Sequence, residues 1–271
     1  MKLSLCNEVI RELSFERQCA LAATLGYRGL ELAPFTFGDD GWRMPAVKRA
    51  EIREACADAG IEVSGLHWLL AAPAGLSITT ADRAVWQKSV DILRASVDLC
   101  AELGGVYLVH GSPAQRRIES SGDARRAEEA WSIAAAAAQK AGVVYCLEAL
   151  ATPDCNFINT VAEASAVVQR IGNPAFKSML DTSAAGQMEA EPLADLIRRW
   201  MPTGLMAHIQ LNDRNRRGPG EGDDKFGPIL QALDETGYAG WVAMEPFIYE
   251  PDGPTCAARM IGYVSGLLER P

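Results

Sequence analysis

Glu148, Asp181, His208 and Glu245 each lie at or near the end of a β-rich apolar run, and their residue types suit metal binding and proton transfer. An ionised carboxylate beside an apolar strand is costly unless it is paired or bound to a cation. Three carboxylates and one imidazole form an oxygen-rich donor set that favours Mn²⁺ or Mg²⁺, with Co²⁺ or Zn²⁺ as further candidates. We therefore predict one divalent metal ion held by these four residues.

Glu148 and Glu245 are also the predicted acid and base. A divalent ion that holds a hydroxyketone would acidify the proton next to the carbonyl by stabilising an enediolate. One glutamate would then remove that proton and the other would return one. Return to the same carbon is epimerisation, and return to the neighbouring carbon is aldose–ketose isomerisation. Loss of a β-hydroxyl after the same first step would make the enzyme a dehydratase, and these residues leave the three outcomes open.

The other two histidines of the chain, His67 and His110, also fall near the ends of predicted strands, and Glu31 does the same in GLELAP. A single histidine at such a place is about as often a satisfied core residue as a site residue.

Short β-rich runs alternate with longer helical patterns along the whole chain. Strict alternation predicts a parallel sheet, and eight units without a linker predict one (β/α)8 TIM barrel, of class α/β, over residues 1–271. The alternative is an open doubly wound sheet, which the absence of GxGxxG and GxxxxGK[ST] motifs weakens. The predicted strands are residues 2–6, 29–33, 61–70, 106–110, 143–148, 176–181, 205–211 and 241–246.

The loops of this predicted barrel are unequal in length. Helix-to-strand connections such as LGYRG and TGYAG are short and contain glycine, whereas strand-to-helix connections such as NDRNRRGPGEGDDKF are long. Barrel enzymes carry their chemistry on loops that leave the carboxyl ends of the strands. We therefore expect the site on that face.

The net charge, the cysteine pattern and the lack of long apolar runs limit which molecules the protein is expected to bind. The formal net charge is -9, which opposes binding to a nucleic-acid backbone. The seven cysteines form no CxxC pair, and this pattern indicates reduced thiols. We found no secretory signal and no apolar run of membrane-spanning length, so we expect a soluble cytoplasmic protein that binds a small molecule rather than a membrane.

Four sequence segments resemble one known family. They are LEALATPDCNFINT, MLDTSAAGQME, HIQLNDRNRRGPGEG and MEPF. Together they resemble the xylose isomerase-like TIM-barrel superfamily, in its branch of ketose 3-epimerases, hydroxypyruvate isomerases and inosose isomerases or dehydratases. The resemblance implies a carbohydrate substrate, one divalent ion (usually Mn²⁺, Mg²⁺ or Co²⁺) on the four residues named above, and a homo-oligomer.

The resemblance also implies substrate contacts. Arg214 stands six residues after the metal histidine, where epimerase-like members have an arginine that contacts substrate, whereas Arg216 and Arg217 have no such match and are expected to be solvated loop charges. The remaining implied or candidate substrate contacts are His67, Trp68, His110, Asp154 and Phe247.

Three positions depart from the ketose 3-epimerase pattern. Ala184 stands where those enzymes tend to have a histidine, Asp154 where they favour a glutamate, and Gln210 where a second histidine is common. The sequence therefore does not identify the sugar, or whether it is phosphorylated. An apurinic-endonuclease-like phosphodiesterase with three zinc ions would need more ligands than the chain offers. A carbohydrate-binding barrel without catalysis would not need two opposed glutamates.

Overall fold

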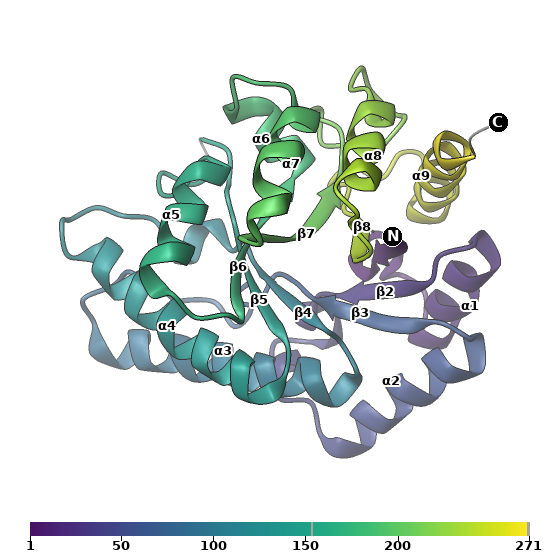
Figure 1. Cartoon of the computed structure of the whole chain (residues 1–271). Helices are drawn as coiled ribbons and strands as arrows, with labels where there is room; N and C mark the ends of the chain where they lie inside the picture. Colours follow the sequence, from purple (N-terminus) through teal and green to yellow (C-terminus); the bar gives the residue numbers. More distant parts are fainter. Residues whose placement is uncertain (153, 270–271) are drawn as a thin grey trace.

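The chain forms a closed barrel of eight parallel strands in this computed structural model, which describes residues 1–152 and 154–269 (Figure 1). Residues 153, 270 and 271 of the domain expected over 1–271 lie outside this description. The barrel closes because β1 pairs with both β2 and β8, which excludes the open sheet. The strands are β1 Lys2–Cys6, β2 Gly29–Leu32, β3 Glu62–Leu66, β4 Tyr107–His110, β5 Val144–Glu148, β6 Phe176–Asp181, β7 Met206–Leu211 and β8 Trp241–Met244.

Helices follow each strand and lie outside the barrel (Figure 1). Their buried faces repeat every three to four residues, as Val90, Leu93, Val97 and Cys100 do in α3. Glycines with left-handed backbone follow most of these helices, as the sequence predicted. The helices are α1 Phe15–Leu25, α2 Ala46–Ala59, α3 Arg83–Leu103, α4 Asp123–Ala141, α5 Val161–Ile171, α6 Thr182–Met188, α7 Leu193–Trp200, α8 Phe226–Glu235 and α9 Gly253–Leu268.

The strands present two faces with a period of two residues. Leu108, Leu147 and Leu180 belong to the large core between the strands and the helices. The residues next to them, which include Tyr107, Cys146 and Met179, form a separate cluster inside the barrel. Glu148 and Asp181 stand two residues beyond Cys146 and Met179, so the same alternation turns their side chains inward at the carboxyl ends of the strands.

The pairing register between neighbouring strands determines which inward-facing residues lie at the same height along the barrel axis. Between β6 and β7, Met179 pairs with His208 and Asp181 pairs with Gln210, with a register shift between Ser178 and Met179. Gln210 is therefore level with Asp181, and His208 lies one inward-facing layer deeper, about 6–7 Å away along the strand.

No helix among the described residues is long and apolar enough to cross a membrane. All seven cysteines are buried and unpaired with one another in disulfides in this structure.

Candidate functional site

Three buried carboxylates meet at the carboxyl end of the barrel. Glu148 ends β5, Asp181 ends β6 and Glu245 directly follows β8. One ligand atom from each lies within 4.8 Å of those of the other two. We call this set the carboxylate cluster. Asp181 is oriented from two sides, because its carboxylate accepts from the backbone N–H of Ala184 at 2.7 Å and from Asn212 Nδ2 at 2.7 Å.

The carboxylate cluster favours protons in the absence of a cation. Burial raises the pKa of Glu245 to about 8 and that of Asp181 to about 6, and burial together with the charges of Asp181 and Glu245 raises the pKa of Glu148 well above its ordinary value. Ionised carboxylates so close together and so deeply buried need a positive partner.

A cavity that opens to solvent lies beside the carboxylate cluster. Glu148 and Glu245 line it, together with residues from the long loops of the carboxyl face. Among them, Trp68, Ser112 and Arg216 have positive φ values of 53°, 47° and 69°. Left-handed backbone is strained in residues other than glycine and gathers at functional sites. The cavity is therefore the best-supported binding site.

Arg216, rather than Arg214, reaches this cavity. The Arg216 guanidinium lies 4.6 Å from the ring centroid of Phe247 and 3.4 Å from Asp154 Oδ2, and all three residues line the cavity. Arg214 instead donates from Nε to Asp224 Oδ1 at 2.7 Å, and its side chain is mostly exposed. The expectation that Arg214 contacts substrate, and that Arg216 is a solvated loop charge, is therefore not met.

His208 is not a member of the carboxylate cluster. Its ring stacks on Tyr107 with centroids 3.9 Å apart, and its Nε2 lies 3.0 Å from Glu31 Oε2. Tyr107 and Gln210 Nε2 also donate to Glu31. Burial opposes ionisation of Glu31, but the nearby imidazoles of His208 and His67 hold its pKa at about 2. Neither ring nitrogen of His208 has a hydrogen-bond partner among the described residues, so His208 joins this buried network through ring stacking and its close approach to Glu31, one layer below the expected metal position.

Gln210, two residues after His208 on β7, has a buried side-chain oxygen that could bind a cation. Its amide nitrogen is fixed by Glu31 at 2.7 Å, whereas its Oε1 is buried and has no hydrogen-bond partner among the described residues. Gln210 is level with Asp181 on the neighbouring strand. A buried acceptor without a donor lowers the stability of the fold by about 1–3 kcal/mol. A bound ligand or ion would satisfy this oxygen. A divalent cation fits three carboxylates and one amide oxygen.

His67 and His110 have different surroundings, although both follow predicted strands. His67 lines the cavity, and its Nδ1 lies 3.0 Å from Glu245 Oε1. His110 alternates with the inward Val109 and therefore faces the helices, where its Nδ1 lies 2.6 Å from the Tyr145 hydroxyl and its ring meets Trp131 edge-on. His110 is thus absent from the cavity wall, contrary to expectation.

Trp68, Asp154 and Phe247 line the cavity, and their contact with substrate stays a prediction. The rings of Trp68 and Phe247 form an edge-to-face pair with centroids 6.3 Å apart, so the two aromatic side chains make a continuous apolar wall.

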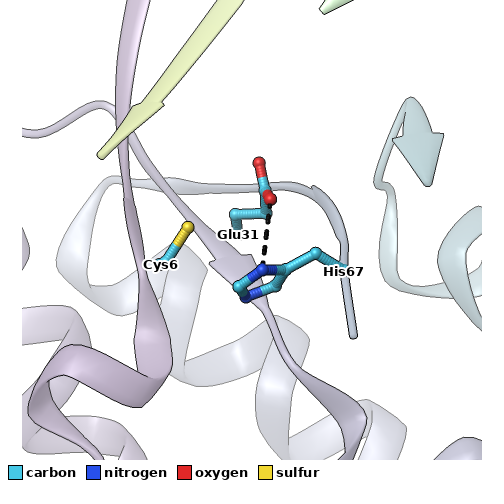
Figure 2. Close-up of side chains that lie close together, drawn as sticks. All are labelled: Cys6, Glu31 and His67. Carbon is cyan, nitrogen blue, oxygen red and sulfur yellow. Dashed lines mark ion pairs between the residues drawn. The ribbon is translucent and has the colours of Figure 1, made fainter. Parts of the chain in front are cut away.

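A second group of ligand-type side chains adjoins the cavity and shares His67 with its wall. In Figure 2, Cys6, Glu31 and His67 point toward one another, and the dashed line marks the 3.6 Å ion pair between His67 Nδ1 and Glu31 Oε1. Burial and the nearby carboxylates raise the pKa of the Cys6 thiol, which disfavours the thiolate that a metal would bind. Because Glu31 already accepts hydrogen bonds from Tyr107 and Gln210, this group is explained as a polar network.

Sequence reasoning missed Glu8, Gln210 and Arg216. Glu8 lies in a short 3-10 turn just after β1, and its Oε2 lies 3.0 Å from His67 Nε2. The available signal was its place two residues after Cys6, on the inward face of the first strand. For Gln210 the signal was its spacing of two from His208. The left-handed backbone of Arg216 cannot be read from its residue type.

Comparisons with known proteins agree with this fold. Residues 19–262 match the family model described as xylose isomerase-like TIM barrel. A D-psicose 3-epimerase from Agrobacterium fabrum is 29% identical over 172 residues, which are 64% of this chain and 58% of that protein. A putative hydroxypyruvate isomerase from Streptomyces coelicolor is 28% identical over 264 residues, 90% of this chain and 88% of that protein. The chain thus spans little more than half the length of the psicose epimerase.

Solved structures share the fold. The structure of an L-ribulose 3-epimerase superposes with a TM-score of 0.84 at 24% identity, covering 99% of this chain and 95% of that one. The closed barrel, the carboxylates at its carboxyl end and the match over most of the sequence lead to one conclusion: the chain belongs to the xylose isomerase-like TIM barrel family.

Proposed function

We propose that this protein is an epimerase or isomerase of a small ketose or a related polyhydroxy carbonyl compound, with Glu148 and Glu245 as the acid–base pair. The observation that carries this proposal is the meeting of three buried carboxylates, of which Glu148 and Glu245 line a cavity whose wall includes left-handed backbone at Trp68, Ser112 and Arg216. The similarity to a D-psicose 3-epimerase and to a putative hydroxypyruvate isomerase supports the same reaction class.

One divalent ion completes the proposed site. Mn²⁺ is the favoured ion, and Mg²⁺, Co²⁺ and Zn²⁺ are the other candidates. Glu148, Asp181, Glu245 and Gln210 Oε1 would hold the ion, because they supply three buried, mutually repelling carboxylates and one unpartnered amide oxygen, all of them hard donors. When bound, such an ion polarises a substrate carbonyl and acidifies the neighbouring C–H bond.

The two glutamates then move the proton. One carboxylate accepts a proton from the carbon next to the carbonyl, and the other donates one. Donation to the opposite face of that carbon inverts it, whereas donation to the former carbonyl carbon, with the hydroxyl proton moving between the oxygens, exchanges ketose and aldose. Both glutamates line the cavity, so a substrate there can reach both.

Arg216 and the aromatic wall orient the substrate in this proposal. The guanidinium presents N–H donors to hydroxyl or carbonyl oxygens, while Phe247 and Trp68 cover the apolar face of a sugar. Asp154, 3.4 Å from Arg216, keeps the guanidinium over the cavity and can accept from a hydroxyl.

Solvent exchange tests the proposal. The Mn²⁺-loaded protein is incubated in D₂O with ketoses, hydroxypyruvate and inososes, and deuterium next to the carbonyl is followed by NMR. We expect exchange with at least one compound, and a fall of about 10²–10⁴-fold in Glu148→Gln and in Glu245→Gln. Absence of exchange across the panel would contradict the proposal.

The mass of the product distinguishes an epimerase or isomerase from a dehydratase. An unchanged mass identifies epimerisation or isomerisation, and loss of water identifies a dehydratase. We do not propose the phosphodiesterase, because Ala184 stands in the wall of an adjoining cavity where that chemistry needs a histidine ligand.

A further inference from the structure

His67 lies between two acidic residues that come from opposite ends of the sequence. Its Nδ1 is 3.0 Å from Glu245 Oε1, and its Nε2 is 3.0 Å from Glu8 Oε2. All three side chains are buried. The elements explain the meeting, since Glu8 follows β1, Glu245 follows β8, and these two strands are neighbours in the barrel.

The imidazole has little freedom to turn in this arrangement. Each ring nitrogen has a carboxylate partner at 3.0 Å, and Glu31 lies 3.6 Å from Nδ1. The backbone is held as well, because the His67 N–H donates to the Leu32 carbonyl at 3.0 Å. Rotation of the ring would leave two buried carboxylates without a donor, which is costly.

Because the His67 ring is held in place, its contact with Oε1 also holds the orientation of the Glu245 carboxylate. A carboxylate has two oxygens and about four lone-pair sites, so Oε1 can accept from His67 while the group still faces Glu148 and Asp181. Glu245 belongs both to the carboxylate cluster and to a second group made with Glu8 and His67. Without the histidine contact, the Glu245 side chain could turn away from two other negative carboxylates.

We propose that Glu8 and His67 are positioning residues that hold the Glu245 carboxylate toward Glu148 and Asp181, and thereby set the affinity of the site for its divalent ion. The inference rests on the proposed function for the role of the ion. Partners that orient a ligand of a metal ion change metal affinity about 10–100-fold. His67 touches the cavity, but its main effect is on Glu245 rather than on substrate.

Two substitutions at His67 separate its two contacts. An asparagine amide nitrogen can take the place of Nδ1, and a glutamine amide nitrogen the place of Nε2. His67→Asn thus keeps the donor to Glu245 and loses the one to Glu8, whereas His67→Gln does the reverse. Glu8→Gln keeps an acceptor for His67 Nε2 but removes its charge.

The experiment measures Mn²⁺ binding alone, from the free ion signal in electron paramagnetic resonance, on full-length protein without substrate. We expect one ion per chain in the wild type, binding about 10–100-fold weaker in His67→Gln, and smaller losses in His67→Asn and Glu8→Gln. His110→Asn is the matched control, since His110 faces the helices, and its affinity for Mn²⁺ should equal that of the wild type. Circular dichroism checks that each variant is folded.

Steady-state kinetics at saturating Mn²⁺ add a second readout. A positioning role lowers kcat with little change in KM, whereas a direct substrate contact raises KM. Glu8→Gln, which cannot touch substrate in this geometry, should shift kcat in the same direction as His67→Gln.

The outcomes are distinct. Equal Mn²⁺ affinity in wild type, His67→Gln and Glu8→Gln overturns the positioning role and leaves the proposed function standing. Two ions per chain, one of them lost in His67→Gln, overturns it in favour of a second metal site. A wild type that binds none of the four candidate ions overturns both proposals. If His67→Gln does not fold, Glu8→Gln decides alone.

Discussion

Arg214 and Arg216 are two residues apart on the loop between β7 and α8, yet they meet different surroundings. Arg216 lies over Phe247 in the cavity, and Arg214 pairs with Asp224 at the surface. We expect Arg216→Gln to lower kcat/KM about 10–100-fold, since hydrogen bonds from charged donors contribute about 1.5–3 kcal/mol. Arg214→Gln should stay within about twofold, because exposed ion pairs contribute little. Steady-state assays on the compound that shows exchange measure both, and the opposite ranking would contradict the placement.

Gln210 and His208 form a second matched pair at the residue scale. Gln210→Leu removes the unpartnered Oε1, and we expect Mn²⁺ binding to weaken about tenfold, which is ~1.4 kcal/mol. His208→Gln should leave Mn²⁺ affinity unchanged and lower the free energy of unfolding by about 1–3 kcal/mol, because Glu31 loses a buried partner. Binding isotherms and denaturant unfolding measure the two effects. Weaker binding in His208→Gln alone would restore His208 as the ligand.

The sequence alone could not decide whether His208 or Gln210 is the metal ligand on β7. Both side chains face inward because they are two residues apart, and the resemblance to a known family favoured the histidine. Only the register between β6 and β7, including its shift between Ser178 and Met179, places Gln210 level with Asp181. Register between distant strands depends on packing of the whole barrel. By contrast, the outward direction of His110 could have been inferred from its alternation with Val109.

At the scale of elements, the Glu148 carboxylate at the end of β5 lies directly against Gly111, which follows β4. A Cβ atom built on Gly111 would overlap Glu148 Oε2. We expect Gly111→Ala to displace the Glu148 carboxylate, and thus to weaken Mn²⁺ binding and slow solvent exchange by at least about tenfold each. The same assays used for the glutamate variants measure this effect.

Gly266→Ala is the control for that substitution. Gly266 lies in α9, and its added Cβ would meet nothing within 4 Å. Activity should be unchanged, and the unfolding free energy should rise by about 0.5–1 kcal/mol because alanine favours helix. If Gly111→Ala matched the wild type in both assays, Glu148 would have room that the structure does not show.

The elements themselves were predicted well from sequence. Alternation of β-rich and helical runs gave all eight strands in order, and the long loops after β3, β4, β5 and β7 lie on the expected face. These features follow from local periodicity and turn chemistry. The position of Arg216 over the cavity depends instead on the conformation of a single loop, whose Asp213 carboxylate accepts from the backbone N–H groups of Asn215 and Asp224.

At the scale of the whole molecule, the carboxylate cluster links stability to pH. The pKa values of Glu245 (about 8), Asp181 (about 6) and Glu148 are raised in the folded chain, so the native state binds more protons than the unfolded state between about pH 5 and 8. Stability from these groups is complete below their ordinary pKa values and is lost as pH rises through the raised ones. We expect the metal-free protein to lose on the order of several kcal/mol of unfolding free energy across this range.

Addition of Mn²⁺ should reverse that trend, because the ion binds the ionised carboxylates and competes with protons for them. Chemical unfolding at several pH values, with chelator or with Mn²⁺, measures both curves. The stabilisation by Mn²⁺ should be larger at pH 8 than at pH 6. A metal-free protein that grows more stable toward pH 8 would contradict the burial of these charges.

The order of the strands around the barrel also has a consequence for biosynthesis. The carboxylate cluster takes its members from β5, β6 and β8, and His67 holds Glu245 from the far side of the seam where β8 meets β1. A nascent chain on the ribosome therefore carries Glu148 and Asp181 without their third partner until β8 has been translated. In the proposed site, capture of the cation would therefore belong to the last stage of synthesis, when Glu245 joins Glu148 and Asp181.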